Sequence, residues 1–171
     1  MDTPCKKNAN KISKYSGILG RLKHFLPVHI LKTIYCSIIQ SNLNYSLLAW
    51  GYDCKRLVKL QKKIIRIITL SRYNAHTEPL FKKLELLNIT DMLKHNTLKF
   101  YYKLKKQEVP DYFLSYQVLT RGDIHGRNTR YNKSILRNTT RTKTQQNCLR
   151  SFLPKVINET ASNILEKNKY T

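Results

Sequence analysis

The spacing of apolar residues over the first 118 positions predicts a series of helices. Residues 11–23, 27–50 and 55–70 carry apolar side chains three and four positions apart. That spacing aligns side chains on one face of an α-helix, whereas a strand would alternate every second residue. Pro27 suits the first turn of the second helix, and Trp50–Gly51 is expected to close it. The core contacts expected from that helix are Leu31, Ile34, Tyr35, Ile38, Ile39, Leu43 and Leu47.

Two further helices are predicted after a polar break at residues 71–79. Residues 80–87 form a short helix, and residues 89–106 form a longer one whose start Thr90 is expected to cap. Pro110 is expected to end that longer helix, because proline disrupts a helical interior, and one or two further turns follow it.

The helix predicted over residues 55–70 has two chemically distinct sides. At 100° per residue the apolar side holds Leu57, Leu60, Ile64, Ile67 and Ile68. The opposite side carries Lys55, Lys59, Lys62, Lys63 and Arg66. No acidic residue stands four positions from these cations to neutralise them. The basic side is therefore either a solvated helix face or a surface that follows the phosphates of a nucleic acid.

The character of the chain changes after residue 118. Residues 119–147 are rich in Arg, Thr and Asn and offer few side chains to bury, so this segment is expected to be loose unless it docks on a partner. Helical spacing returns near the end of the chain, where Pro154 limits the place at which a helix can begin. We therefore predict a mostly α protein: a small helical bundle over residues 11–118, then a basic, partly irregular C-terminal segment over 119–171.

The charge balance indicates the chemistry of the partner, which is expected to be anionic. The chain has 32 Lys and Arg against 10 Asp and Glu, a formal net charge of +22 and a pI near 10.0. A field of this sign favours polyanions, so RNA, DNA or an RNA–DNA hybrid is the expected partner and an anionic membrane surface is the alternative. No apolar run approaches the ~20 residues that a transmembrane helix needs. The N-terminus lacks the apolar region of a signal peptide, so an intracellular location, cytoplasmic or nuclear, is expected.

Motifs for catalysis, metal binding and cofactor binding are absent from the sequence. The five histidines and four cysteines are too scattered for a triad or a zinc site. Neither GxGxxG nor GxxxxGK[ST] occurs, and no adjacent Asp pair is present to hold the two metals of a polymerase. We therefore expect no catalytic residue, no metal and no cofactor.

The heptapeptide IHGRNTR, residues 124–130, is the most unusual stretch. Arg127 and Arg130 offer forked donors, Thr129 a hydroxyl, and Gly126 room for a close backbone approach. These groups suit a grip on phosphate, and an exposed polar loop explains them equally well. A second basic contact is expected from the arginines of this region, namely Arg121, Arg127, Arg130, Arg137 and Arg141.

Several spacings together resemble the region that follows the fingers and palm in reverse transcriptases of non-LTR (LINE-type, jockey-like) retrotransposons. The matching positions are Lys11–Ile12, Gly17–Leu19, Leu26–Pro27, Tyr35, Ser37, Ile39, Tyr45, Trp50–Gly51 and Leu60–Gln61–Lys62–Lys63 with Arg66. The family's His-x-x-Asn-Thr-Arg signature is matched by His125, Asn128, Thr129 and Arg130. The sequence LPKVIN resembles a late Leu-Pro-x-x-Trp/Tyr-Asn element, with Ile157 where an aromatic residue is usual.

The resemblance extends from about residue 11 to about residue 160 and implies the thumb and the segment after it, which brace the template–primer duplex. The family's paired-Asp metal loop lies upstream, so this chain is expected to be a C-terminal fragment that is inactive alone and works with an upstream polymerase domain. HGRNTR is then expected to order the basic segment near nucleic acid, with His125, Asn128 and Thr129 among the residues that bind it. A decayed relic without selected function, and a basic amphipathic binder of membrane surfaces, are the alternatives.

Overall fold

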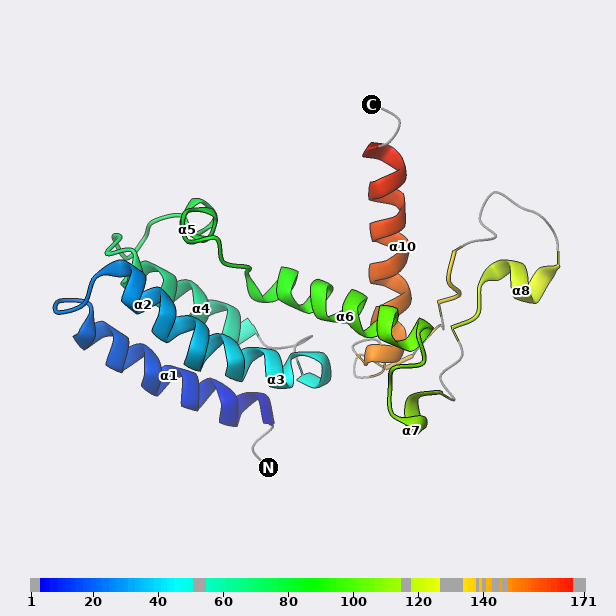
Figure 1. Cartoon of the computed structure of the whole chain (residues 1–171), viewed down its shortest axis with the longest axis horizontal. Helices are drawn as coiled ribbons and strands as arrows, with labels where there is room; N and C mark the ends of the chain where they lie inside the picture. Colours follow the sequence, from blue (N-terminus) through cyan, green and yellow to red (C-terminus); the bar gives the residue numbers. More distant parts are fainter. Residues whose placement is uncertain are drawn as a thin grey trace. The chain divides into compact units, whose positions relative to one another are not determined.

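The computed structural model describes residues 4–50, 55–114, 118–126, 134–137 and 148–167, with positions 139, 141, 142 and 145. The predicted mostly α class is confirmed: these residues form helices and one isolated bridge between extended residues. The chain packs as two compact units, Met1–Leu93 and Lys94–Thr171, which divide inside α6, whereas the composition of the sequence changes at residue 118. The elements (Figure 1) are α1 (Pro4–Leu22), α2 (Val28–Ile34), the π-helix η1 (Tyr35–Gln40), α3 (Ser41–Trp50), α4 (Lys55–Ile68), α5 (Glu78–Leu84), α6 (Ile89–Lys105), α7 (Asp111–Leu114), α8 (Arg121–His125) and α10 (Leu149–Lys167).

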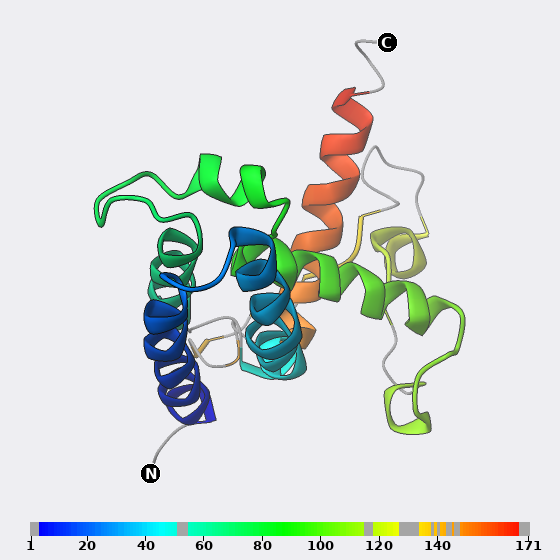
Figure 2. The ribbon, with the colours of Figure 1, turned by 60° about the vertical axis from the view of Figure 1, so that its left-hand side comes forward.

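The first unit is built on three helical rods. Figures 1 and 2 show α1, the continuous rod α2–η1–α3, and α4 packed against one another. The α2–η1–α3 rod, which is the middle rod in sequence, runs opposite to α1 and α4. Each rod buries one stripe of side chains. The buried residues are Ala9, Ile12, Ser16 and Leu19 from α1, Leu31, Tyr35, Ile39, Leu43 and Leu47 from the middle rod, and Leu57, Gln61, Ile64, Ile65 and Ile68 from α4.

The middle rod buries every fourth residue from Leu31 to Leu47. Four residues of α-helix turn by about 400°, so a stripe at this spacing would drift by about 40° per step around an ordinary helix. The wider turns of η1 rotate the stripe back toward the core. Ile34 and Ile38, also expected in the core, lie off this stripe and are half-buried and exposed, respectively.

Side chains support the backbone of the π segment. Ser41 donates from Oγ to the carbonyl of Ser37 at 2.6 Å, and Asn42 donates from Nδ2 to the carbonyl of Ile38 at 2.6 Å. The Ile38 carbonyl also accepts from the backbone N–H of Ser41, so side-chain donors reinforce the backbone bonds at the end of the π segment. The local sequence SIIQSN therefore favours this geometry at the centre of the rod.

Several predicted helix ends are displaced. α1 begins at Pro4 rather than residue 11, because Ala9 continues the stripe of Ile12 by one turn. α5 begins at Glu78, two residues early, with Pro79 in its first turn, and ends before Glu85, which has a left-handed φ of 55°.

The cap expected from Thr90 is wrong. Asn88 caps α6: its Oδ1 accepts from the backbone N–H of Asp91 at 2.8 Å, and its Nδ2 donates to the Asp91 carboxylate at 2.7 Å. The stop expected from Pro110 is also wrong. α6 ends at Lys105, followed by Gln107 with φ 59°, and Pro110 instead precedes α7.

Part of the segment 119–147, which was expected to be loose, has a defined structure in the second unit. The side chain of Thr120 and the carboxylate of Asp123 form a capping box that begins α8. Thr120 also forms an antiparallel bridge with Ile135. α10 begins at Leu149 and continues through Pro154, so this proline does not set the start of the last helix.

Candidate nucleic-acid interface

The basic side of α4 is exposed as predicted. Lys55, Lys59, Lys62 and Lys63 face solvent, whereas Arg66 is half-buried. The buried side is rotated from the predicted one: Gln61 and Ile65 are buried, and Leu60 and Ile67 are only half-buried. A scheme that places polar residues outside would not bury a glutamine at the centre of this face.

Gln61 is buried because its whole side-chain amide is hydrogen-bonded. Its Nε2 donates to the Tyr35 hydroxyl at 2.8 Å and to the Leu87 carbonyl at 3.0 Å. Its Oε1 accepts from the backbone N–H of Ile89, the first residue of α6, at 2.9 Å. A buried amide is tolerated when its donors and acceptor are paired. These bonds fix the rotation of α4 and thereby direct its lysines to the opposite side.

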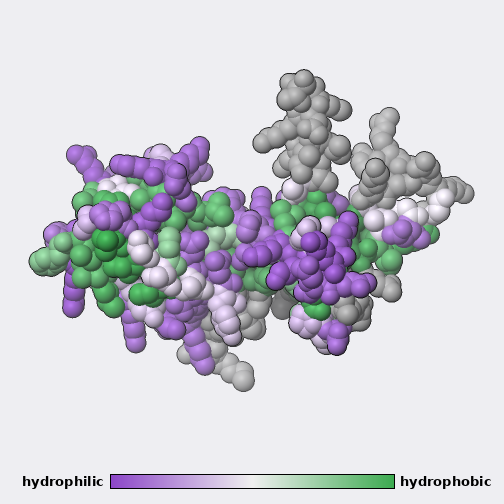
Figure 3. All heavy atoms as spheres, in the orientation of Figure 1, coloured by the Kyte–Doolittle hydropathy of each residue, from purple (hydrophilic) through white to green (hydrophobic). Residues whose placement is uncertain are grey.

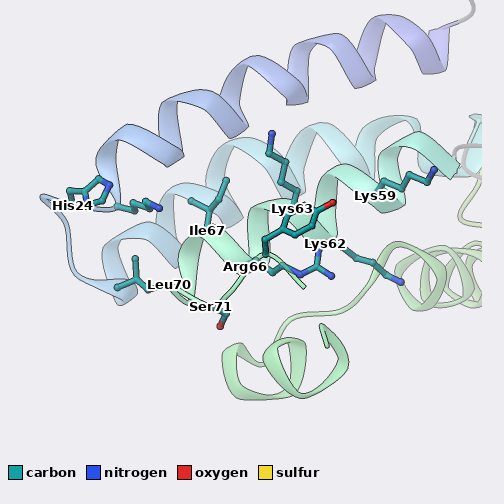
Figure 4. A pocket seen from close by; sticks show the side chains of 10 residues that line it. His24, Lys59, Lys62, Lys63, Arg66, Ile67, Leu70 and Ser71 are labelled. Carbon is teal, nitrogen blue, oxygen red and sulfur yellow. The ribbon is translucent and has the colours of Figure 1, made fainter. Parts of the chain in front are cut away.

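A groove of about 700 Å³ lies along the basic side of α4, against the end of α1 and the turn that follows α4 (Figure 4). Figure 4 shows that Lys59, Lys62, Lys63 and Arg66 all project from α4, whereas His24 comes from the turn after α1. The four α4 cations were predicted from the sequence, whereas Lys23, His24 and Tyr73 were not. The residues that line the groove are Lys23, His24, Lys59, Lys62, Lys63, Arg66, Ile67, Leu70, Ser71 and Tyr73.

The basic groove is separate from a second depression of this unit, which several acidic residues and Lys82 line. Among the residues that the structure describes, the lining of the groove includes five Lys and Arg side chains and no Asp or Glu. Three acids, Glu78, Glu85 and Asp91, line a separate depression beside α5. The ion pair that Lys32 forms with Glu85 at 3.6 Å lies outside the groove's lining. In the described part of its lining, a polyanion would therefore meet cations without a carboxylate to repel it.

Arg66 has a structural role that the sequence did not reveal. Its Nε donates to the carbonyl of Ala75 at 2.9 Å, which ties the turn after α4 to the helix. Leu70 enters that turn with φ 53°, and the Ser71 backbone N–H bonds the Arg66 carbonyl at 3.0 Å. The groove thus has a floor formed by a helix and a rim formed by a fixed turn.

The second predicted basic region is only partly described. Arg121, Arg137 and Arg141 are exposed, with Arg121 on α8 and Arg137 two residues after the bridge. The backbone of His125 ends α8, and Gly126 follows with φ 58°. Arg127, Asn128, Thr129 and Arg130 lie outside the described residues, as does the side chain of His125.

Asn158 on α10 binds the backbone of Ile135, which lies five residues after the HGRNTR motif. Its Oδ1 accepts from the Ile135 N–H, and its Nδ2 donates to the Ile135 carbonyl, both at 2.9 Å. One amide thereby pairs both backbone groups of a buried residue, as a neighbouring strand would. Asn158 is the last residue of LPKVIN, so these two hydrogen bonds connect that stretch to Ile135, the residue that bridges Thr120.

Hydrophobic residues interrupt the hydrophilic surface, as Figure 3 shows. Several large apolar or aromatic side chains are exposed in the first unit, including Phe25 at 84%, Leu70 at 60% and Tyr73 at 93%. Of these, Leu70 and Tyr73 line the basic groove.

Within the ranges that the structure describes, no group of three or more His, Cys, Asp or Glu side chains is arranged to hold a metal ion. None of the helices in those ranges combines the length and the apolar character needed to cross a membrane. Comparison of the chain with models of protein families, with curated proteins and with solved structures gives no match.

Proposed function

We propose that this chain binds nucleic acid through backbone phosphates and braces a template–primer duplex, as the thumb region of a non-LTR retrotransposon reverse transcriptase does. The proposal assigns it no catalytic step of its own. It joins the sequence resemblance to a single structural observation. The groove along α4 gathers Lys23, Lys59, Lys62, Lys63 and Arg66, and none of the described residues that line it is acidic.

Phosphate binding explains this arrangement better than an ordinary solvated face. A row of like charges on one helix face costs stability unless counterions or a ligand neutralise it. Lys62 and Lys63 lie three and four positions after Lys59, so both flank it on the same face of α4, about one turn further along the helix. Such a row can follow consecutive phosphates without reading bases, because phosphate contacts position a protein but do not specify sequence.

The test compares two variants of equal net charge. The groove variant is Lys59→Ala, Lys62→Ala and Lys63→Ala together. The matched control is Lys7→Ala, Lys14→Ala and Lys83→Ala, which removes three exposed lysines from α1 and α5 that do not line the groove. Both variants lower the formal charge from +22 to +19, so a difference between them reports position rather than total charge.

The measurement is the affinity for an RNA–DNA hybrid, followed by fluorescence anisotropy of a labelled strand, with helical content checked by circular dichroism. We expect the groove variant to bind at least ~10-fold more weakly than the control variant, because a phosphate that no lysine neutralises keeps its counterions and releases none on binding. Equal affinities for the two variants would refute a defined phosphate-binding surface. A wild-type chain without helical circular dichroism would favour the decayed relic. Binding to anionic vesicles that outcompetes the hybrid would favour the membrane alternative.

A further inference from the structure

We propose that the groove along α4 also takes an unpaired nucleotide, whose base stacks on Tyr73 while its phosphates contact the lysines of α4. The proposal rests on the proposed function and narrows it, because it assigns one end of the groove to single-stranded nucleic acid. Its ligand is a single strand at the edge of a duplex, or a free single strand, of either RNA or DNA.

The first observation is the display of Tyr73. This side chain is 93% exposed and yet lines the groove beside the cations of α4. An aromatic ring that is exposed on both faces contributes little to a core, because most of its apolar area stays in water. Aromatic side chains next to a basic groove are the means by which proteins bind single strands: the cations contact the backbone and the rings stack on the bases.

The second observation is that the turn carrying Tyr73 is fixed. Arg66 donates from Nε to the Ala75 carbonyl at 2.9 Å, and the Ala75 N–H donates to the Arg72 carbonyl at 3.1 Å. Thr69 Oγ1 lies 2.9 Å from Ser71 Oγ on the other side of the turn. The same arginine thus belongs to the cationic row and anchors the turn. A ring carried on a backbone that is ordered before binding costs less entropy to dock than one on a flexible loop.

The third observation is the apolar character of the groove near this turn. Ile67 and Leu70 line it together with Tyr73, and Leu70 remains 60% exposed. Phosphates gain nothing from isoleucine and leucine side chains, whereas the flat face of a base is apolar and does. The volume of about 700 Å³ lies within the range that holds a drug-sized molecule, which is the size of a nucleotide. The faces of a paired base inside a duplex are covered by the neighbouring bases. Only an unpaired base can therefore stack against the apolar part of the groove beside Tyr73.

The experiment measures affinity for an oligothymidylate of about eight nucleotides, a length within the usual range of single-strand sites. The same chain is tested on an oligomer of equal length in which the bases are replaced by abasic sites. We expect Tyr73→Ala to weaken oligothymidylate binding by about 5- to 100-fold, the usual effect of losing one base–aromatic stack. Tyr73→Phe keeps the ring and is expected to stay within about twofold of the wild type.

The abasic oligomer turns this comparison into a double-mutant cycle. Wild type is expected to lose on the abasic oligomer about the same factor that Tyr73→Ala loses on oligothymidylate, and the variant should lose little more when the bases are removed. Binding to an RNA–DNA hybrid, whose bases are paired, should hardly change in Tyr73→Ala. Because Tyr73 is exposed, its replacement should leave the fold intact, and unchanged circular dichroism verifies this.

Three contrary outcomes are distinguishable. If Tyr73→Ala binds oligothymidylate as wild type does, while the three-lysine groove variant is weakened on the hybrid, the stacking proposal is wrong and the phosphate-binding function stands. If the groove variant also binds the hybrid normally, the proposed function itself is wrong. If Tyr73→Ala loses binding only to vesicles of anionic phospholipid, Tyr73 faces a membrane and the stacking proposal is overturned.

Discussion

The side-chain oxygen of Gln61, in the middle of α4, accepts a hydrogen bond from the backbone N–H of Ile89, the first residue of α6, at 2.9 Å. Both residues are buried. The first N–H groups of a helix have no partner within it, so a side chain from elsewhere must satisfy them where water is excluded. Gln61 does this for α6 while its amide nitrogen holds Tyr35 and Leu87, which makes it the polar centre of the first unit.

Replacing Gln61 by leucine should therefore be strongly destabilising, although leucine is apolar and similar in size. The substitution leaves the Ile89 N–H, the Leu87 carbonyl and the Tyr35 hydroxyl without this partner, and each unpaired buried group costs about 1–3 kcal/mol. Because Ile89 and Tyr35 are the buried residues among the three, we expect the free energy of unfolding to fall by about 2–6 kcal/mol, measured by urea denaturation. Lys62→Leu, one residue away on the exposed side, is the control and should change it by less than about 0.5 kcal/mol. Equal effects of the two substitutions would contradict this role for Gln61.

Tyr35 predicts a specific loss of stability at alkaline pH. Burial raises the pKa of its phenol from 10.0 to about 12, and the hydrogen bond from Gln61 offsets part of that rise. Below pH 10 the phenol is neutral in both the folded and the unfolded state, so it adds no pH dependence. Between pH 10 and 12 only the unfolded state ionises, and stability should fall by about 1.4 kcal/mol per pH unit from this residue.

Comparison with Tyr35→Phe isolates that effect from other titrating groups. At pH 7 the variant should be about 1 kcal/mol less stable than wild type, because it loses the hydrogen bond with Gln61. By about pH 11.5 the order should reverse, since phenylalanine does not ionise in the unfolded state. Denaturation at the two pH values measures both differences. A stability gap that stays constant across this pH range would show that Tyr35 titrates normally.

Asn158 should control the local stability of the chain at Ile135. Asn158→Ala removes both hydrogen bonds to the Ile135 backbone, and Asn158→Asp keeps the acceptor but places a carboxylate against the Ile135 carbonyl. In either variant the Ile135 amide should exchange its hydrogen about 5- to 100-fold faster, as expected for a loss of about 1–3 kcal/mol in local opening free energy. Glu159→Gln, whose side chain forms an exposed pair with Lys155, serves as the control and should leave that rate unchanged. Unaltered exchange in both Asn158 variants would contradict a positioning role.

The sequence predicts the helices of the first unit and the exposed cations of α4, because apolar periodicity and a one-sign helix face are local properties. It does not predict that Gln61 is buried, because a glutamine is placed in a core only by partners from η1, the α5–α6 connection and α6, which are distant in sequence. The cap at Asn88 was missed for a different reason. Both Asn88 and Thr90 are acceptable capping residues, and the choice depends on where the core starts the helix.

The groove, too, is predicted only in part from the sequence. Its floor on α4 follows from the spacing of Lys59, Lys62 and Lys63, whereas its rim requires the Arg66–Ala75 hydrogen bond, which no sequence pattern indicates. Tyr73 stands in a polar break where an aromatic residue carries no helical or strand pattern, so only its exposure beside the cations indicates a use.

The central claim is that this chain binds nucleic acid through phosphates at the groove, and the salt dependence of binding tests it most directly. The logarithm of the affinity for an RNA–DNA hybrid is measured against the logarithm of the salt concentration for wild type, the groove variant and the equal-charge control. If about 6–10 phosphates are neutralised, wild-type affinity should fall by about 10³- to 10⁵-fold between 50 and 200 mM salt. The slope of the groove variant should be smaller in magnitude by about two to three, and that of the control nearly unchanged. A wild-type affinity indifferent to salt, or the same slope for both variants, would contradict the account.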